Sequence, residues 1–192
     1  MVNDTSLELN LDSKKVYEAY NFASDMYAGV FKKTGKPYFQ HLIEVALIIQ
    51  EYYSGNDDLI AASLLHDCIE DSLDVNHEII LERFGKKVAD IVQELTDNVS
   101  DLDGLETHDK KQVKKFRKLE SLKVISNEAK IVFLADKISN ARYKITKTNK
   151  TIKWKTNYAS FLKEICSLLE EQKFESPLIS LLKTEIQTFN AL

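Results

Sequence analysis

The chain contains the stretch Leu64-Leu65-His66-Asp67-Cys68-Ile69-Glu70-Asp71, which sets one imidazole and three carboxylates in an otherwise apolar run. With the apolar residues before it, this stretch predicts a helix over 57–69. On a helix, Glu70 lies four residues from His66 and Asp71 four from Asp67, so the polar groups share one stripe. Crowded carboxylates on a largely buried helix repel one another and lose hydration unless a cation holds them. The adjacent His66 and Asp67 therefore indicate a chelate for a divalent metal, and an amphipathic helix with a solvated acidic face is the alternative.

Two further apolar segments each carry one group able to bind a metal. His41 stands near the start of a helix expected over 38–53. Asp136 follows an apolar run in the helix expected over 128–145. Taken singly, such a histidine is usually a cap or a satisfied core group, and such an aspartate a buried hydrogen-bond acceptor. Together, His41, His66, Asp67 and Asp136 form a His-His-Asp-Asp set carried by three helices.

The order of these motifs resembles the HD-domain hydrolases that depend on a metal, and specifically the hydrolase domain of RelA/SpoT-type proteins and the small alarmone hydrolases. Residues 35–41, Gly-Lys-Pro-Tyr-Phe-Gln-His, are similar to that family's G-x-P-Y-x-x-H. Residues 62–72 resemble its A-x-L-L-H-D-x-x-E-D-T, and residues 134–142 match Leu-Ala-Asp-Lys-x-x-Asn-x-Arg. Residues 83–97 are similar to its F-G-x-x-V…(L/V)-T-D. The resemblance spans roughly residues 12–169.

The resemblance implies a function and a set of site residues. His41, His66, Asp67 and Asp136 would hold Mn²⁺, although Fe, Co and Zn also suit this donor set. Glu70 would act as general acid/base, and Asp71 would be its partner that orients the water. The substrate would be ppGpp or pppGpp, cleaved at the 3′-diphosphate to GDP or GTP plus pyrophosphate. Groups expected to bind this polyphosphate nucleotide lie beside the ligand segments: Lys32, Lys33, Lys36, Tyr38, Lys137, Asn140 and Arg142.

The chain departs from the family pattern at three positions. Lys32 stands where the family commonly has arginine, nine residues before His41. A planar guanidinium that stacks on a base is not replaced by an ammonium, so we expect weak discrimination between guanine and adenine. Leu42 replaces the usual proline, and Ser139 stands where many members have His or Tyr. The expected ligand set is intact.

Length and composition narrow the class of protein. A chain of 192 residues is most simply one domain with its own core, and two cysteines make no disulfide framework. Cys68 is expected to be small buried filler. There is no apolar run long enough to span a membrane and no signal peptide at the start, so we expect a cytoplasmic protein. The net charge of −4 argues against nucleic-acid binding. A monomer or small homo-oligomer is expected.

The pattern predicts an all-α fold, a single HD-type helical bundle of about 8–10 helices over residues 1–192. Only two prolines and five glycines interrupt it. We expect N-caps at Asn56, at Asp74 and at Ser126 or Asn127. Residues 1–12 should be loosely held, and 98–107 are the best candidate for a mobile loop. The helices are expected over 16–31, 38–53, 57–69, 76–84, 86–95, 108–122, 128–145, 154–171 and 177–189.

Two other functions are compatible with the sequence. One is an HD phosphohydrolase for another nucleotide, such as (p)ppApp, a deoxynucleotide or NADPH. The other is a non-catalytic helical module that senses nucleotide, although such a module would be expected to lose a ligand or the Glu70-Asp71 pair. Alarmone synthesis is not expected, since the residues after the resemblance form only one or two helices.

Overall fold

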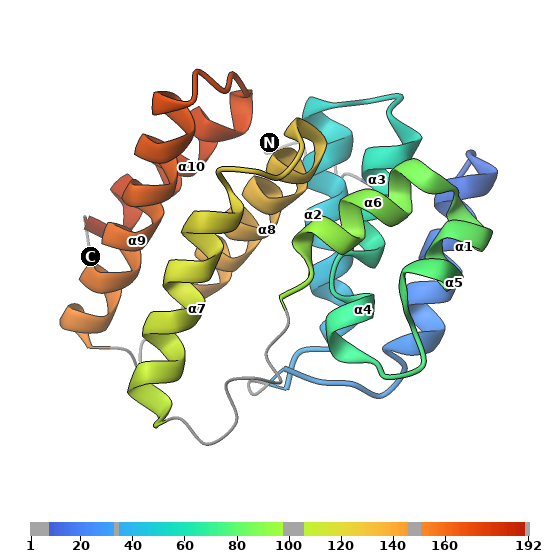
Figure 1. Ribbon diagram of the computed structural model, residues 1–192, viewed down its shortest axis with the longest axis horizontal. Coiled ribbons are helices and arrows are strands. Elements are labelled where there is room, and N and C mark those ends of the chain that lie inside the picture. Colours follow the sequence, from blue (N-terminus) through green and yellow to red (C-terminus); the bar gives the residue numbers. More distant parts are fainter. Residues whose placement is uncertain (1–7, 33–34, 98–105, 146–150, 191–192) are drawn as a thin grey trace, which may run out of the picture. The chain divides into compact units, whose positions relative to one another are not determined.

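A computed structural model describes residues 8–32, 35–97, 106–145 and 151–190 of the chain. Its regular elements in these ranges are helices, apart from one isolated bridge between Phe31 and Pro37 (Figure 1). The all-α class is therefore confirmed. The helices are α1 (Lys14–Met26), α2 (Tyr38–Tyr52), α3 (Asp57–Leu65), α4 (Cys68–Asp71), α5 (His77–Phe84), α6 (Lys86–Leu95), α7 (Thr107–Ser121), α8 (Asn127–Ile145), α9 (Ile152–Glu171) and α10 (Pro177–Asn190).

The chain divides into two compact units, and the boundary falls in the last turn of α6. Unit 1 comprises residues 1–93 and unit 2 comprises residues 94–192. Each unit carries part of the expected ligand set: His41, His66 and Asp67 belong to unit 1, and Asp136 belongs to unit 2. The expectation of a single domain stays a prediction.

Unit 1 is organised around α3, which packs against both α1 and α2. Every residue from Leu59 to Leu65 is buried, which explains why this segment is apolar on all sides. Helix α2 contributes Leu42, Val45 and Ile49 to the same core. Because α3 is enclosed by its neighbours, its packing fixes the position of His66 and Asp67, which follow it.

The expected helix over 57–69 is wrong at its end, because α3 stops at Leu65 and a turn at His66 and Asp67 separates it from α4. The His66 ring bonds the Ser63 carbonyl at 2.7 Å, and this carbonyl is the group to which residue 67 would donate in a continuous helix. The side chain thus competes with the helical hydrogen bond. His66 and Asp67 lie at a helix–helix junction and not on one helical stripe.

The expected helix over 16–31 also ends early, because α1 stops at Met26. Gly29 has a φ of 74°, a left-handed conformation that glycine adopts without strain. The Val30 amide donates to the Tyr27 carbonyl at 3.1 Å, which closes a turn around this glycine. The turn brings the chain into the segment before α2.

Side-chain caps fix the starts of several helices. Asn56 accepts from the Leu59 amide at 3.2 Å, and Ser126 accepts from the Ala129 amide at 3.2 Å, as expected. The expected cap at Asp74 is wrong, since Asn76 accepts from the Ile79 amide at 3.0 Å and α5 begins at His77. Asp74 instead lies in the preceding turn, where its amide donates to the Ser72 hydroxyl.

Replacing Asn56 by alanine should lower the free energy of unfolding by about 1 kcal/mol, because the Leu59 amide loses its side-chain acceptor. Urea denaturation followed by circular dichroism measures this change, with an unchanged m-value. Asn56→Asp is the matched control and should retain most of the stability. Equal losses in both variants would show that the cap does not contribute.

Unit 2 is built on α8, which packs against α10, while α10 also packs against α9. The core includes Leu134 and Ile138 of α8, Leu162 and Ile165 of α9, and Leu182 of α10, all fully buried. Helix α7 lies against α9. Asp136 and Asn140 lie one turn apart on α8, so their side chains share one side of the helix. The packing of the buried face of α8 fixes the direction of that side.

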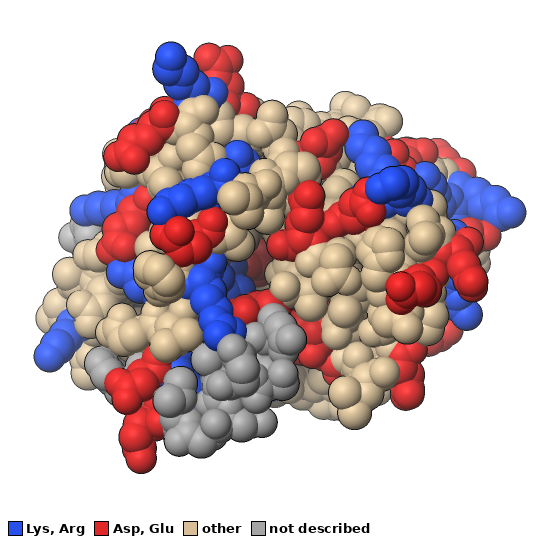
Figure 2. Space-filling model, in the orientation of Figure 1, with Lys and Arg blue, Asp and Glu red and all other residues tan. Residues whose placement is uncertain are grey.

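The surface is mixed in charge, and Figure 2 shows Lys/Arg and Asp/Glu side chains interspersed on the visible face of each unit. The two units nevertheless differ in net charge. Residues 1–93 contain 8 Lys and Arg against 16 Asp and Glu, whereas residues 94–192 contain 18 against 14. None of the helices in the described ranges is long and apolar enough to cross a membrane.

Candidate metal centre

A hydrogen bond at Nδ1 holds the His66 ring in one orientation. Its Nδ1 lies 2.7 Å from the Ser63 carbonyl, and the Ser63 hydroxyl donates to the Ile60 carbonyl at 2.7 Å. A carbonyl can only accept, so Nδ1 carries the proton when the ring is neutral. Nε2 then presents its lone pair at the other side of the ring. Metal-binding histidines are oriented by a bond of this kind at the opposite nitrogen.

Asp67 faces that lone pair. Its Oδ2 lies 3.2 Å from His66 Nε2, and the Tyr38 hydroxyl donates to the same oxygen at 2.5 Å. A lone pair and a carboxylate oxygen repel each other at this distance unless a proton or a cation is shared between them. The donor chemistry of the pair therefore fits a divalent cation.

His41 completes the set that unit 1 brings together. It is buried in the first turn of α2, and its ring centroid lies 5.7 Å from that of His66 at an interplanar angle of 71°. A ligand nitrogen of His41 and one of His66 lie within 4.8 Å of each other, close enough to share one ion. The edge of the His41 ring also meets Tyr38, with 5.9 Å between centroids. Unit 1 thus brings the two imidazoles together, and Asp67 faces one of them, that of His66.

Glu70 and Asp71 lie on α4 and are solvent-exposed. Asp71 Oδ2 accepts from the Tyr27 hydroxyl at 2.9 Å. Partial desolvation raises the pKa of Asp71, the Tyr27 hydrogen bond lowers it, and the charge of Asp67 raises it again. The net direction is upward, which suits a group that exchanges protons. Tyr27 was not among the residues expected from the sequence, because nothing in a helix-ending tyrosine signals a carboxylate partner.

Asp136 is enclosed by donors within unit 2. Asn140 Nδ2 donates to its Oδ1, and Lys137 Nζ donates to its Oδ2. Lys137 is itself buried, with Nζ 4.4 Å from the centroid of the Phe133 ring. Burial and then the charge of Asp136 raise the pKa of the nearby Tyr158 hydroxyl. Asp136 is thus a hydrogen-bonded carboxylate whose donors are residues also expected at the site.

The remaining residues expected to bind substrate are each described within their own unit. Lys32 places Nζ 5.1 Å from the centroid of the Tyr38 ring. Lys36 is exposed, and Lys33 lies outside the described residues. Arg142 is exposed and donates through Nε to Glu185 at 2.7 Å. The roles assigned to these residues stay predictions.

Cys68, the residue after Asp67, is fully buried, as expected of a small side chain that fills space in the core. Burial raises the pKa of its thiol.

Residues 19–161 match the HD domain family, and this match covers well over half of the chain. The chain belongs to the HD domain family. HD domains depend on a metal, and unit 1 holds a facing histidine–aspartate pair with a second histidine ring nearby. The expected HD membership is confirmed.

Relatives of this HD domain are alarmone enzymes by name. The bifunctional (p)ppGpp synthase/hydrolase SpoT of Escherichia coli K12 is 37% identical over 131 residues, which are 67% of this chain and 18% of that protein. Guanosine-3′,5′-bis(diphosphate) 3′-pyrophosphohydrolase of Aquifex aeolicus is 32% identical over 130 residues, covering 68% and 18%. The HD domain chain thus spans about a fifth of the length of these curated relatives.

A solved structure shares the fold over nearly its whole length. It is described as a metazoan ortholog of SpoT that hydrolyzes ppGpp and plays a role in starvation responses. The TM-score is 0.74 at 26% identity, with 95% of this HD domain chain and 99% of the other chain covered. A second structure, lmo0812 from Listeria monocytogenes EGD-e, has a TM-score of 0.59 at 21% identity and supports the fold alone.

Proposed function

We propose that this HD domain hydrolyses the 3′-diphosphate of guanosine alarmones, converting ppGpp or pppGpp to GDP or GTP and pyrophosphate. The observation that carries the proposal is the facing pair of His66 Nε2 and Asp67 Oδ2, with the His41 ring beside it. The names of the relatives supply the substrate class. The proposed setting is the cytoplasm, where such hydrolysis lowers the stringent-response signal.

The proposed ion is Mn²⁺, held by His41, His66 and Asp67 with Asp136 as the fourth ligand. Two imidazoles with carboxylates suit Mn²⁺, and Asp136 is assigned by its place in the Leu-Ala-Asp-Lys motif. When bound, such an ion polarises a phosphoryl oxygen and lowers the pKa of bound water. The protein fixes the donors: Ser63 orients His66, and Tyr38 orients Asp67.

Glu70 and Asp71 are proposed to act together on the attacking water. Glu70 takes the role of general acid/base, and Asp71 orients the attacking water. Both are exposed on α4, so both can reach a bound substrate from outside the buried donor set. Partial burial raises the pKa of the Asp71 carboxyl above its ordinary value.

The substrate carries four or five phosphates, and the chain must supply cations for them. Unit 1 has an excess of acidic residues, whereas unit 2 has an excess of basic ones. We therefore assign the phosphate contacts to Lys32, Lys33 and Lys36 before His41, and to Lys137 and Arg142 on α8, with Asn140 near the sugar. Arg142 would exchange its Glu185 partner for a phosphate.

The test is product identity. Full-length protein incubated with ppGpp and Mn²⁺ should release GDP and pyrophosphate in equal amounts, as resolved by ion-exchange chromatography. GMP-type or monophosphate products, or no turnover, would contradict the proposal. Deoxynucleotides and NADPH in the same panel distinguish the wider HD phosphohydrolase activity from this one.

Relaxed base choice is a second possibility favoured by one contact. Lys32 Nζ lies over the Tyr38 ring, 5.1 Å from its centroid, so its ammonium is engaged with an aromatic face inside unit 1. An ammonium in this place cannot stack on a purine as a guanidinium does. We therefore propose the adenine alarmone (p)ppApp as an additional substrate.

We expect ppGpp and ppApp to differ by less than about 100-fold in kcat/KM, because a site without specific base contacts separates close analogues poorly. Both substrates are measured under identical Mn²⁺ and salt concentrations. Lys32→Arg should lower KM for both purine alarmones. A larger preference would reveal base-reading groups elsewhere, and an unchanged KM would show that residue 32 does not face the base.

A further inference from the structure

Two tyrosines of unit 1 connect the carboxylates on either side of α4. Tyr27 and Tyr38 stack with 4.9 Å between ring centroids and an interplanar angle of 17°. The Tyr38 hydroxyl donates to Asp67, and the Tyr27 hydroxyl donates to Asp71. The two nearly parallel rings thus place one hydroxyl on each of two carboxylates, Asp67 and Asp71, of the His-Asp-x-x-Glu-Asp segment.

Tyr27 is held rigidly enough to orient its partner. It is 4% exposed, and its amide donates to the Ala23 carbonyl at 3.0 Å, so it closes the end of α1. Burial raises the pKa of the hydroxyl, which keeps its proton and acts only as a donor. Asp71, by contrast, is an exposed side chain on the four-residue helix α4. The hydrogen bond from the buried Tyr27 hydroxyl therefore fixes the rotamer of the exposed Asp71 side chain.

We infer that Tyr27 is a positioning residue that acts on the reaction through Asp71. The Tyr38 ring, which stacks on Tyr27 and whose hydroxyl donates to Asp67, holds the Tyr27 ring in place. The inference rests on the proposed function, in which Asp71 orients the water. It assigns to Tyr27 a role separate from metal binding, because its hydroxyl donates to Asp71, whereas the Tyr38 hydroxyl donates to Asp67.

A double-mutant cycle tests this role. Tyr27→Phe keeps the buried ring and removes the hydroxyl, so kcat for ppGpp should fall about tenfold, as expected for one hydrogen bond to a charged group. KM and Mn²⁺ affinity should stay within about twofold. In the Asp71→Ala background, which leaves no side-chain acceptor for the Tyr27 hydroxyl, the same substitution should change kcat by less than about twofold.

The matched control is Tyr20→Phe on α1, the helix that Tyr27 caps, where the Tyr20 and Phe39 ring centroids lie 5.0 Å apart in a T-shaped contact. It removes a tyrosine hydroxyl that has no part in the proposed site and should leave kcat unchanged. An equal kcat loss from Tyr27→Phe in both backgrounds would overturn the inference. A loss of Mn²⁺ affinity equal to the loss of rate would also overturn it, because Tyr27 would then act through the metal ligands.

A second measurement separates this inference from the proposed function, because it needs no turnover. The ¹³C carboxyl signal of Asp71, assigned by its absence in Asp71→Asn, is followed against pH in full-length protein without added metal. Tyr27→Phe should raise the pKa of Asp71, since the lost donor stabilises the ionised form, while His66 and Asp67, which also act on this carboxyl, are unchanged. An unchanged pKa would overturn the positioning role even if ppGpp is hydrolysed.

Discussion

His66→Ala or Asp67→Ala should abolish both metal binding and alarmone hydrolysis, with a loss of more than about 10³-fold in kcat/KM. Each substitution removes one of the two facing donors, and the 3.2 Å contact between them is the centre of the proposed ion site. Metal content measured by inductively coupled plasma mass spectrometry after gel filtration, together with turnover of ppGpp, gives both readouts for one preparation.

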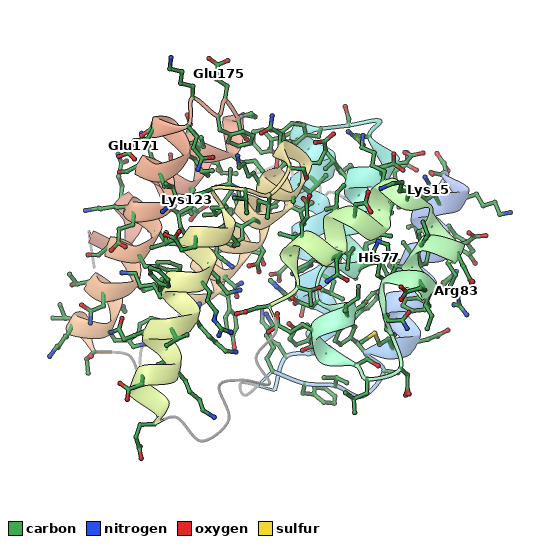
Figure 3. The ribbon with its side chains drawn as sticks, in the orientation of Figure 1. Lys15, His77, Arg83, Lys123, Glu171 and Glu175 are labelled. Atoms are coloured by element: carbon green, nitrogen blue, oxygen red, sulfur yellow. The ribbon has the colours of Figure 1, made fainter. Side chains whose placement is uncertain are left out.

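His77→Ala is the matched control for loss of a histidine in unit 1. His77 lies on α5, labelled in Figure 3, and its Nε2 is 3.3 Å from Asp90 Oδ1, outside the donor set. This variant should keep its metal and its rate. If His66→Ala retained full metal content while His77→Ala lost it, the assignment of the metal centre would be wrong.

Glu70→Gln should retain metal and substrate binding but lose about 10²–10⁴-fold in kcat, because it removes proton transfer without removing a proposed ligand. Glu70 is exposed on α4, so the amide adds no buried polar group and the fold should be unaffected. Steady-state kinetics and Mn²⁺ titration by calorimetry separate the two effects.

Glu78→Gln, an exposed first-turn glutamate of α5, controls for the change of charge. It should leave kcat within about twofold of the parent protein. Loss of metal in Glu70→Gln along with loss of rate would show that Glu70 is itself a ligand, and its role as acid/base would have to be given up.

The sequence predicted the fold class and the core well, because burial and periodicity are local signals. The apolar run before His66 is buried on all sides in α3, and α6 has the expected bounds. The ends of helices were harder to predict. The break after Leu65 depends on the His66 ring bonding the Ser63 carbonyl, and the cap of α5 depends on Asn76 and not on Asp74. Such competition between side chain and backbone has no periodicity to reveal it.

In unit 1 the His41 ring lies near the His66 ring and Asp67 faces His66, while the role of these residues as metal ligands stays a prediction. What the sequence could not supply is the support around it. Tyr27 reaches Asp71 across 44 positions of the chain, and Arg142 finds Glu185 across 43, so both contacts arise only from tertiary packing. Lys33 and residues 98–105, part of the expected mobile loop, lie outside the described residues.

A metal add-back experiment with product analysis tests the central claim most directly. Protein stripped by a chelator and then titrated with Mn²⁺ is assayed with ppGpp at each step. We predict no turnover in the stripped protein, and recovery that saturates near one ion per chain with GDP and pyrophosphate released in equal amounts. Full turnover in excess EDTA, or release of inorganic monophosphate in place of pyrophosphate, would contradict a metal-dependent alarmone 3′-pyrophosphohydrolase.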